Sequence, residues 1–173
     1  MIVVSNTSPL TNLAAIGQFE LLQSLYTQVH IAEGVWDELN ASGKKWPGCL
    51  EVMEATNWVS RSTVQNQDLV TTLRQDLDRG EAESIALGLE LDADLILLDE
   101  KEGRRIAKRL GLKRVGVAGI LLEAKTGGLI KNVQPHLDAL RQQAGFYLSE
   151  VISQSVLTLA NEIQKDSLKV NKG

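Results

Sequence analysis

The chain has 173 residues, of which 43% are hydrophobic, 23% charged and 4% aromatic, and its formal net charge is −4. These values are typical of one globular domain, and the negative charge argues against a protein that coats nucleic acid with its whole surface. Because there is one cysteine, Cys49, and no apolar run near the ~18 residues of a membrane span, we expect a cytoplasmic protein without disulfides or a membrane segment.

The N-terminal half of the sequence alternates short strands with helices. The apolar run 2–4 predicts a buried strand, and Ser8 with Pro9 predicts the N-cap and first position of a helix. A second short helix is expected after Gly17. Further along the chain the pattern predicts strands over 28–31 and 58–62, a helix over 32–40, and a helix that begins near Pro47.

The C-terminal half continues this alternation. The run ADLILLD at 93–99 is the clearest strand, and 113–119 holds a short one. Helices are expected over 67–75, 79–91, 102–112, 120–130, 132–143 and 149–165. This order indicates a three-layer α/β/α sandwich around a central parallel sheet. We expect residues 1–150 to form the main domain and 151–173 a C-terminal helix and polar tail.

Polar and acidic side chains are expected at the carboxyl ends of the strands, where α/β sheets bind ligands. Asn6 and Asp99 follow strands, Glu38 lies on the helix after the second strand, and Glu81 opens the helix before the fourth. Oxygen ligands without a nearby His or Cys suit Mg²⁺ or Mn²⁺. Each residue also has a structural alternative: a solvated helix face for Glu38, a favourable helix N-terminus for Glu81 and Glu83, and an N-cap for Asp99.

A basic segment directly follows Asp99. Against one acid, Glu102, it contains Lys101, Arg104, Arg105, Lys108, Arg109, Lys113 and Arg114. Arg104, Arg105, Lys108 and Arg109 share one broad helix face. Together with Lys101 they could attract the phosphates of a nucleic acid. The alternative is a solubilising surface helix.

The three tryptophans, Trp36, Trp46 and Trp58, are expected to pack inside the protein. With so few aromatic residues, we do not expect a stacking platform for several bases.

Four segments together resemble the PIN-like proteins, above all the prokaryotic branch beside the VapC-type toxin ribonucleases. They are VVSNTSPLTNLA, VWDEL, DRGEAESIALGLELDADLILLDEKEGRRIAKRLGL and GVAGILLEAKTGGLI, and the resemblance covers about residues 1–150. It implies a PIN-like α/β/α sandwich and Mg²⁺- or Mn²⁺-dependent endonucleolytic cleavage of single-stranded RNA. It also implies a homodimer and, for many members, a toxin restrained by a small antitoxin.

The resemblance also assigns site residues. The family's four acidic positions fall, in order, on Asn6, Glu38, Glu81 or Glu83, and Asp99, with Glu100 or Glu102 as an assistant beside the last. Thr7 and Ser8 match the small polar residues that follow the first acid. By this resemblance the first four positions are expected to be catalytic and to bind the metal.

Asn6 departs from the family pattern because an amide brings no charge. Two unit charges ~4 Å apart interact by roughly 4 kcal/mol at an effective dielectric of 20, so the loss of one carboxylate should weaken metal binding. Two functions follow: a PIN-type ribonuclease weakened by Asn6, or a catalytically degraded PIN-like module that binds RNA or protein. An unrelated nucleotide-binding domain is disfavoured, since the sequence has no phosphate-binding loop.

Overall fold

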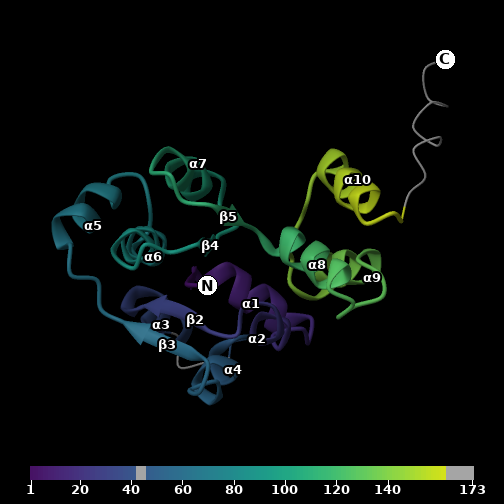
Figure 1. The fold of residues 1–173 in the computed structure, drawn as a ribbon, viewed down its shortest axis with the longest axis horizontal. Helices are drawn as coiled ribbons and strands as arrows, with labels where there is room; N and C mark the ends of the chain where they lie inside the picture. The colour runs from purple at the N-terminus through teal and green to yellow at the C-terminus, as the bar shows by residue number, and fades with distance from the viewer. Residues whose placement is uncertain (42–45, 163–173) are drawn as a thin grey trace.

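The structure, a computed structural model, describes residues 1–41 and 46–162. Its centre is a five-stranded parallel sheet in the order β3-β2-β1-β4-β5 (Figure 1). The strands are β1 (Val3–Ser5), β2 (Val29–Ala32), β3 (Val59–Ser62), β4 (Leu95–Leu97) and β5 (Arg114–Val115). The chain runs outward from β1 to β3 and then returns to place β4 on the other side of β1. The strand order therefore reverses between β1 and β4, which is where such sheets bind ligands.

Helices cover both faces of the sheet (Figure 1). In chain order they are α1 (Thr7–Ala15), α2 (Leu21–Tyr26), α3 (Glu33–Asn40), α4 (Cys49–Glu54), α5 (Gln67–Leu73), α6 (Arg79–Glu90), α7 (Lys101–Arg109), α8 (Val117–Thr126), α9 (Gln134–Gln143) and α10 (Glu150–Leu159). The predicted three-layer α/β/α sandwich with a central parallel sheet is confirmed.

The two sides of the sheet have separate hydrophobic cores, because successive strand residues point to opposite faces. Val3 and Leu97 belong to a core that also takes side chains from α1, α2, α8 and α9. Val4 and Ile96, their chain neighbours, belong to a second core with side chains of α5, α6 and α7. With both faces buried, the middle of the sheet is held rigidly, and the loops at its edge start from fixed positions.

Two predicted helix starts are wrong, and both corrections concern the sheet edge. The N-cap of α1 is Asn6, not Ser8, whose hydroxyl instead donates to the Glu100 carboxylate. Helix α8 begins at Val117, before the predicted 120, and the Val117 N–H donates to Asp99 Oδ1 over 2.9 Å. In both cases a contact between distant segments decides where the helix begins.

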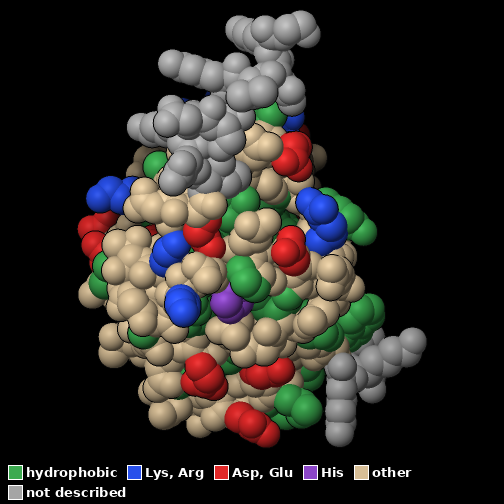
Figure 2. Space-filling model, turned by 90° about the vertical axis from the view of Figure 1, so that its right-hand side faces the viewer, with side chains coloured by type: hydrophobic (Ala, Val, Ile, Leu, Met, Phe, Trp, Pro, Cys, Tyr) green, Lys and Arg blue, Asp and Glu red, His purple; other side chains and the backbone are tan. Residues whose placement is uncertain are grey.

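The C-terminal helix α10 packs on the same domain through Leu157 and Ala160, which are buried. Its other side leaves Val151, Ile152 and Leu159 exposed. On the face toward α9 and α10, hydrophobic side chains appear in several separate places among polar ones (Figure 2). Residues 163–165, where this helix was predicted to end, lie outside the described residues. Within residues 1–41 and 46–162, no helix combines the length and the apolar character needed to cross a bilayer.

Candidate functional site

Asn6 is fixed at the point where the strand order reverses. Its backbone N–H donates to the carbonyl of Leu97 over 3.0 Å, which ties the end of β1 to the end of β4. Its side chain is 2% exposed, and Nδ2 donates to Glu100 Oε2 over 3.1 Å. The amide oxygen Oδ1 is buried and has no hydrogen-bond partner. A buried acceptor without a partner is costly unless a ligand completes it.

Glu38, on α3, reaches the same place from the solvent side. The Thr7 hydroxyl donates to its Oε2. A Cβ atom built on Gly80 would lie 2.6 Å from that oxygen and 3.3 Å from Asn6 Oδ1, so the missing side chain lets both oxygens approach α6. Desolvation raises the pKa of Glu38, and the charges of Asp78 and Glu100 raise it further, against the lowering effect of the hydrogen bond from Thr7.

Glu81 enters from the first turn of α6, through a capping box with Asp78. The Glu81 N–H donates to Asp78 Oδ1 over 2.8 Å, and the Asp78 N–H donates to Glu81 Oε2 over 3.3 Å. The other oxygen, Oε1, is buried without a partner. Burial, followed by the charges of Asp78 and Glu100, raises the pKa of Glu81 to about 7.

Glu83 is directed elsewhere, although it lies only two residues further along α6. Its Oε2 accepts the N–H of Gly34 over 2.6 Å, and its Oε1 accepts from Arg79 Nε over 2.8 Å. Both oxygens thus have partners: Arg79 lies on α6 itself, and the bond from Gly34 ties α6 to the start of α3. The structure gives Glu81 an oxygen without a partner at the sheet edge and gives Glu83 contacts that hold two helices together.

We expect Glu83→Gln to lower the free energy of unfolding by about 1–3 kcal/mol, since it weakens a charge-assisted pair and disturbs the acceptor of a buried N–H. The affinity for Mn²⁺ should change little. Urea unfolding and calorimetric titration of the same preparation measure the two effects. A large loss of Mn²⁺ affinity at unchanged stability would assign Glu83, instead of Glu81, to the site.

Glu100 lies beside Asn6 at this end of the sheet. A further acid there, Asp78, was not predicted from the sequence. Glu100 accepts hydrogen bonds from Asn6 Nδ2 and the Ser8 hydroxyl. Its charge contributes to the raised pKa values of both Glu38 and Glu81. Asp78 could have been recognised from its spacing of three residues before Glu81, which is that of a capping box.

Asp99 lies beside Glu100 but makes different contacts. Its Oδ1 accepts from the Val117 N–H, and it interacts with the Arg104 guanidinium near Gly116. Its Oδ2 is buried without a partner, and burial raises the pKa of Asp99 to about 6. The structure therefore places Asn6, Glu38, Glu81 and Glu100 at one end of the sheet and directs Oδ1 of Asp99 toward the N-terminus of α8.

We call Asn6, Glu38, Glu81 and Glu100 the edge cluster. The atoms with which these residues could bind a metal ion are all oxygens. Among residues 1–41 and 46–162, no three His, Cys, Asp or Glu side chains lie close enough together to hold a metal ion. The buried Asn6 Oδ1 and Glu81 Oε1, both without partners, nevertheless offer the hard oxygen ligands that Mg²⁺ and Mn²⁺ prefer. The residues fit such an ion by the chemistry of their donors.

The raised pKa values predict that stability depends on pH. Because the native state holds the Glu81 proton more tightly than the unfolded chain does, the free energy of unfolding should fall as pH rises from about 4.5 to about 7 and then level off. Asp99 and Glu38 act in the same direction. Urea unfolding in EDTA at pH 5, 6, 7 and 8 measures this. Glu81→Gln should flatten the profile, and a wild-type profile that rises over this range contradicts the prediction.

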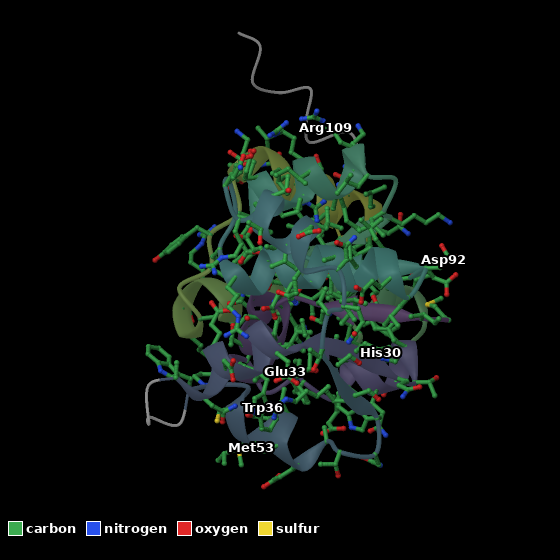
Figure 3. All side chains as sticks on the ribbon, turned by 90° about the vertical axis from the view of Figure 1, so that its left-hand side faces the viewer. His30, Glu33, Trp36, Met53, Asp92 and Arg109 are labelled. Atoms are coloured by element: carbon green, nitrogen blue, oxygen red, sulfur yellow. The ribbon has the colours of Figure 1, made fainter. Side chains whose placement is uncertain are left out.

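The predicted basic face on α7 is partly occupied by contacts within the protein. Arg104 donates to the Leu98 carbonyl over 2.9 Å, and burial lowers its pKa. Arg105 pairs with Glu102. Lys101, Lys108 and Arg109 are exposed, with no ion pair to another described residue. Arg109 lies at one edge of the molecule, well away from Glu33 and Trp36 on α3 (Figure 3).

Comparison with known proteins agrees with this architecture. A family model described as DUF3368, a PIN domain, matches residues 2–162. Among solved structures, the chain is similar to SSO1118, a PilT N-terminus domain protein from the hyperthermophilic archaeon Sulfolobus solfataricus P2. The TM-score is 0.55 at 21% identity, over 72% of this chain and 93% of that one. At this identity the second match speaks for the fold alone. Since the family match spans nearly the whole chain, the protein belongs to the PIN-domain family.

Proposed function

We propose that the chain is a metal-dependent ribonuclease of PIN type that cleaves single-stranded RNA. One observation carries the proposal: three buried oxygens without partners, Asn6 Oδ1, Glu81 Oε1 and Asp99 Oδ2, belong to residues around the reversal of strand order between β1 and β4. A ligand that supplies positive charge would complete these oxygens. It would offset the burial that chiefly raises the carboxyl pKa values and the repulsion between acids that adds to it.

Each residue of the edge cluster has a defined task in this mechanism. Asn6 and Glu81 would offer the metal their unpartnered oxygens, and Glu38 and Glu100 would add carboxylate charge around them. Thr7 and Ser8 hold the carboxylates of Glu38 and Glu100 in position through their hydroxyls. A bound Mg²⁺ or Mn²⁺ would lower the pKa of a water and neutralise charge on the phosphodiester. Lys101, Lys108 and Arg109 would attract the RNA backbone toward this edge.

The second candidate function is an RNA- or protein-binding module with degraded catalysis. It is favoured by Asn6, which removes one negative charge, and by the lack of three clustered metal-binding side chains among the described residues. Cleavage of a mixed-sequence single-stranded RNA in Mg²⁺ or Mn²⁺ separates the two functions. We expect cleavage that EDTA abolishes. Binding without cleavage at any metal concentration would favour the binding module.

The contribution of α7 can be measured through salt dependence. We expect the double change Lys108→Gln and Arg109→Gln to weaken RNA binding and to reduce the slope of log K against log salt by about 1.4, that is, about 0.7 for each lost phosphate contact. Fluorescence anisotropy at several salt concentrations gives the slope. Arg105→Gln is the control, because its partner Glu102 already neutralises Arg105. It removes one positive charge where the double change removes two, so the effects are compared per charge. An equal effect per charge would mean that Lys108 and Arg109 act only through the total charge of α7.

We extend the proposal to the cellular role that the family resemblance implies. The chain would act in the cytoplasm as the toxin of a toxin–antitoxin pair, restrained by a small antitoxin. It would form a homodimer, for which the exposed Val151, Ile152 and Leu159 of α10 offer an apolar surface. Sedimentation of the purified chain tests the dimer, and loss of cell growth on expression tests the toxin.

A further inference from the structure

A pocket of about 390 Å³ opens directly beside the edge cluster. Thr7 and Glu38, which are joined by a hydrogen bond, form the wall that the pocket shares with the cluster. The pocket continues along α1 to the end of α9, and its volume lies within the range of about 300–1,000 Å³ of small-molecule sites. A group bound here would lie next to the oxygens proposed to hold the metal.

The lining of this pocket combines one aromatic face with a few polar groups. Trp46 is 55% exposed, contrary to the prediction that the tryptophans are packed. The other two differ from it: Trp58 is buried, and the guanidinium carbon of Arg61 lies 4.7 Å from the centre of the Trp36 ring. Leu39 and Pro47 add apolar surface. Asn12 and Gln143 make no hydrogen bond to another residue that the structure describes, so their amides are available to donate and accept.

We infer that this pocket binds one base of the single-stranded RNA, the base of the nucleotide adjacent to the cleaved phosphate. A nucleobase has a flat face that can stack on the Trp46 indole and a polar edge that the amides of Asn12 and Gln143 can recognise. The charge of Glu38 disfavours a phosphate inside the pocket, whereas an uncharged base meets no such repulsion. The inference rests on the proposed function and adds a residue set that determines which sequence is cut.

The test compares two oligonucleotides, one intact and one with a single base removed, by fluorescence anisotropy in EDTA so that no cleavage occurs. Loss of stacking on Trp46 should weaken binding of the intact RNA roughly five- to 150-fold in Trp46→Ala. The abasic site is moved along the strand to find the base that enters the pocket. When that base is the missing one, wild type and Trp46→Ala should bind the abasic RNA with equal affinity. Trp46→Phe should restore most of the affinity. Trp36→Ala, a tryptophan outside the pocket, is the matched control, and circular dichroism verifies that each variant folds.

The following results support or overturn the inference. Loss of affinity in Trp46→Ala that depends on one base position supports it, as does an altered base preference in Asn12→Ala or Gln143→Ala. Equal losses in Trp46→Ala and Trp36→Ala, or no loss in either, overturn it. If wild type cleaves RNA while Trp46→Ala binds normally, the base pocket is wrong and the ribonuclease stands. If the Trp46 effect is found but no metal supports cleavage, the pocket stands and the ribonuclease is wrong.

Discussion

Glu81→Gln should abolish metal-dependent function and at the same time make the metal-free protein more stable. The change removes a charge whose interaction with a divalent ion is worth a few kcal/mol, so Mn²⁺ affinity and cleavage rate should each fall by at least about a hundredfold. In EDTA at pH 8 the same change removes a carboxylate that burial and two neighbouring acids destabilise, and the free energy of unfolding should rise. Titration with Mn²⁺, RNA cleavage and urea unfolding measure the three quantities.

Glu83→Gln is the matched control for this experiment. It is the same chemical change two residues away on α6, at a carboxylate that is also buried but has a partner on each oxygen. The two variants should therefore differ in sign: Glu81→Gln loses metal affinity and gains stability, and Glu83→Gln loses stability and keeps metal affinity. A Glu81→Gln protein that binds Mn²⁺ as wild type does would remove Glu81 from the site. Equal changes of Mn²⁺ affinity and of stability in both variants would mean that Glu81 Oε1, the oxygen without a partner, has no specific role.

The architecture was predictable from the sequence because it depends on strong local patterns. Continuous apolar strands between amphipathic helices indicate a parallel sheet covered on both faces, and the observed strands lie within one or two residues of most predicted positions. The helix starts at Thr7 and Val117 were missed because they depend on contacts with Glu100 and Asp99, which are far away in the sequence. Local propensity contains no information about such contacts.

The candidate site was predictable in its position but not in its details. That Asn6 and the acids after β4 share one edge follows from the parallel sheet alone. Which of Asp99 and Glu100 faces Asn6 depends on the turn after Leu97, where the strand ends earlier than predicted. Likewise, Glu81 and Glu83 point in nearly opposite directions on a helix, and only the positions of Gly34 and Arg79 show which of them is already bound.

Asn6→Asp should raise the affinity for Mn²⁺ about a hundredfold, because it restores the charge that the family pattern has at this position. In EDTA the same change should lower the free energy of unfolding by about 1–3 kcal/mol. The Asn6 amide now donates to Glu100 Oε2 over 3.1 Å, and a carboxylate would place a second negative charge there. An acidic N-cap favours α1, but that effect, ~1 kcal/mol or less at one position, is smaller than the repulsion.

The opposite signs of these two effects distinguish a ligand from an ordinary buried residue. Added Mn²⁺ should restore the stability of Asn6→Asp to the wild-type value or above it, since binding to the native state stabilises it by mass action. Asn66→Asp is the control for metal affinity, because Asn66 is also a helix N-cap, on α5, but is exposed and outside the edge cluster. Its N–H donates to the Glu90 carboxylate, so Asn66→Asp also brings two negative charges together, but Mn²⁺ should neither bind there nor restore the lost stability. If Asn6→Asp loses stability that Mn²⁺ does not restore, residue 6 is not a ligand, and its amide serves only to hold Glu100. If Mn²⁺ does restore it and RNA cleavage rises with it, the asparagine is what limits the activity of an otherwise complete PIN-type site.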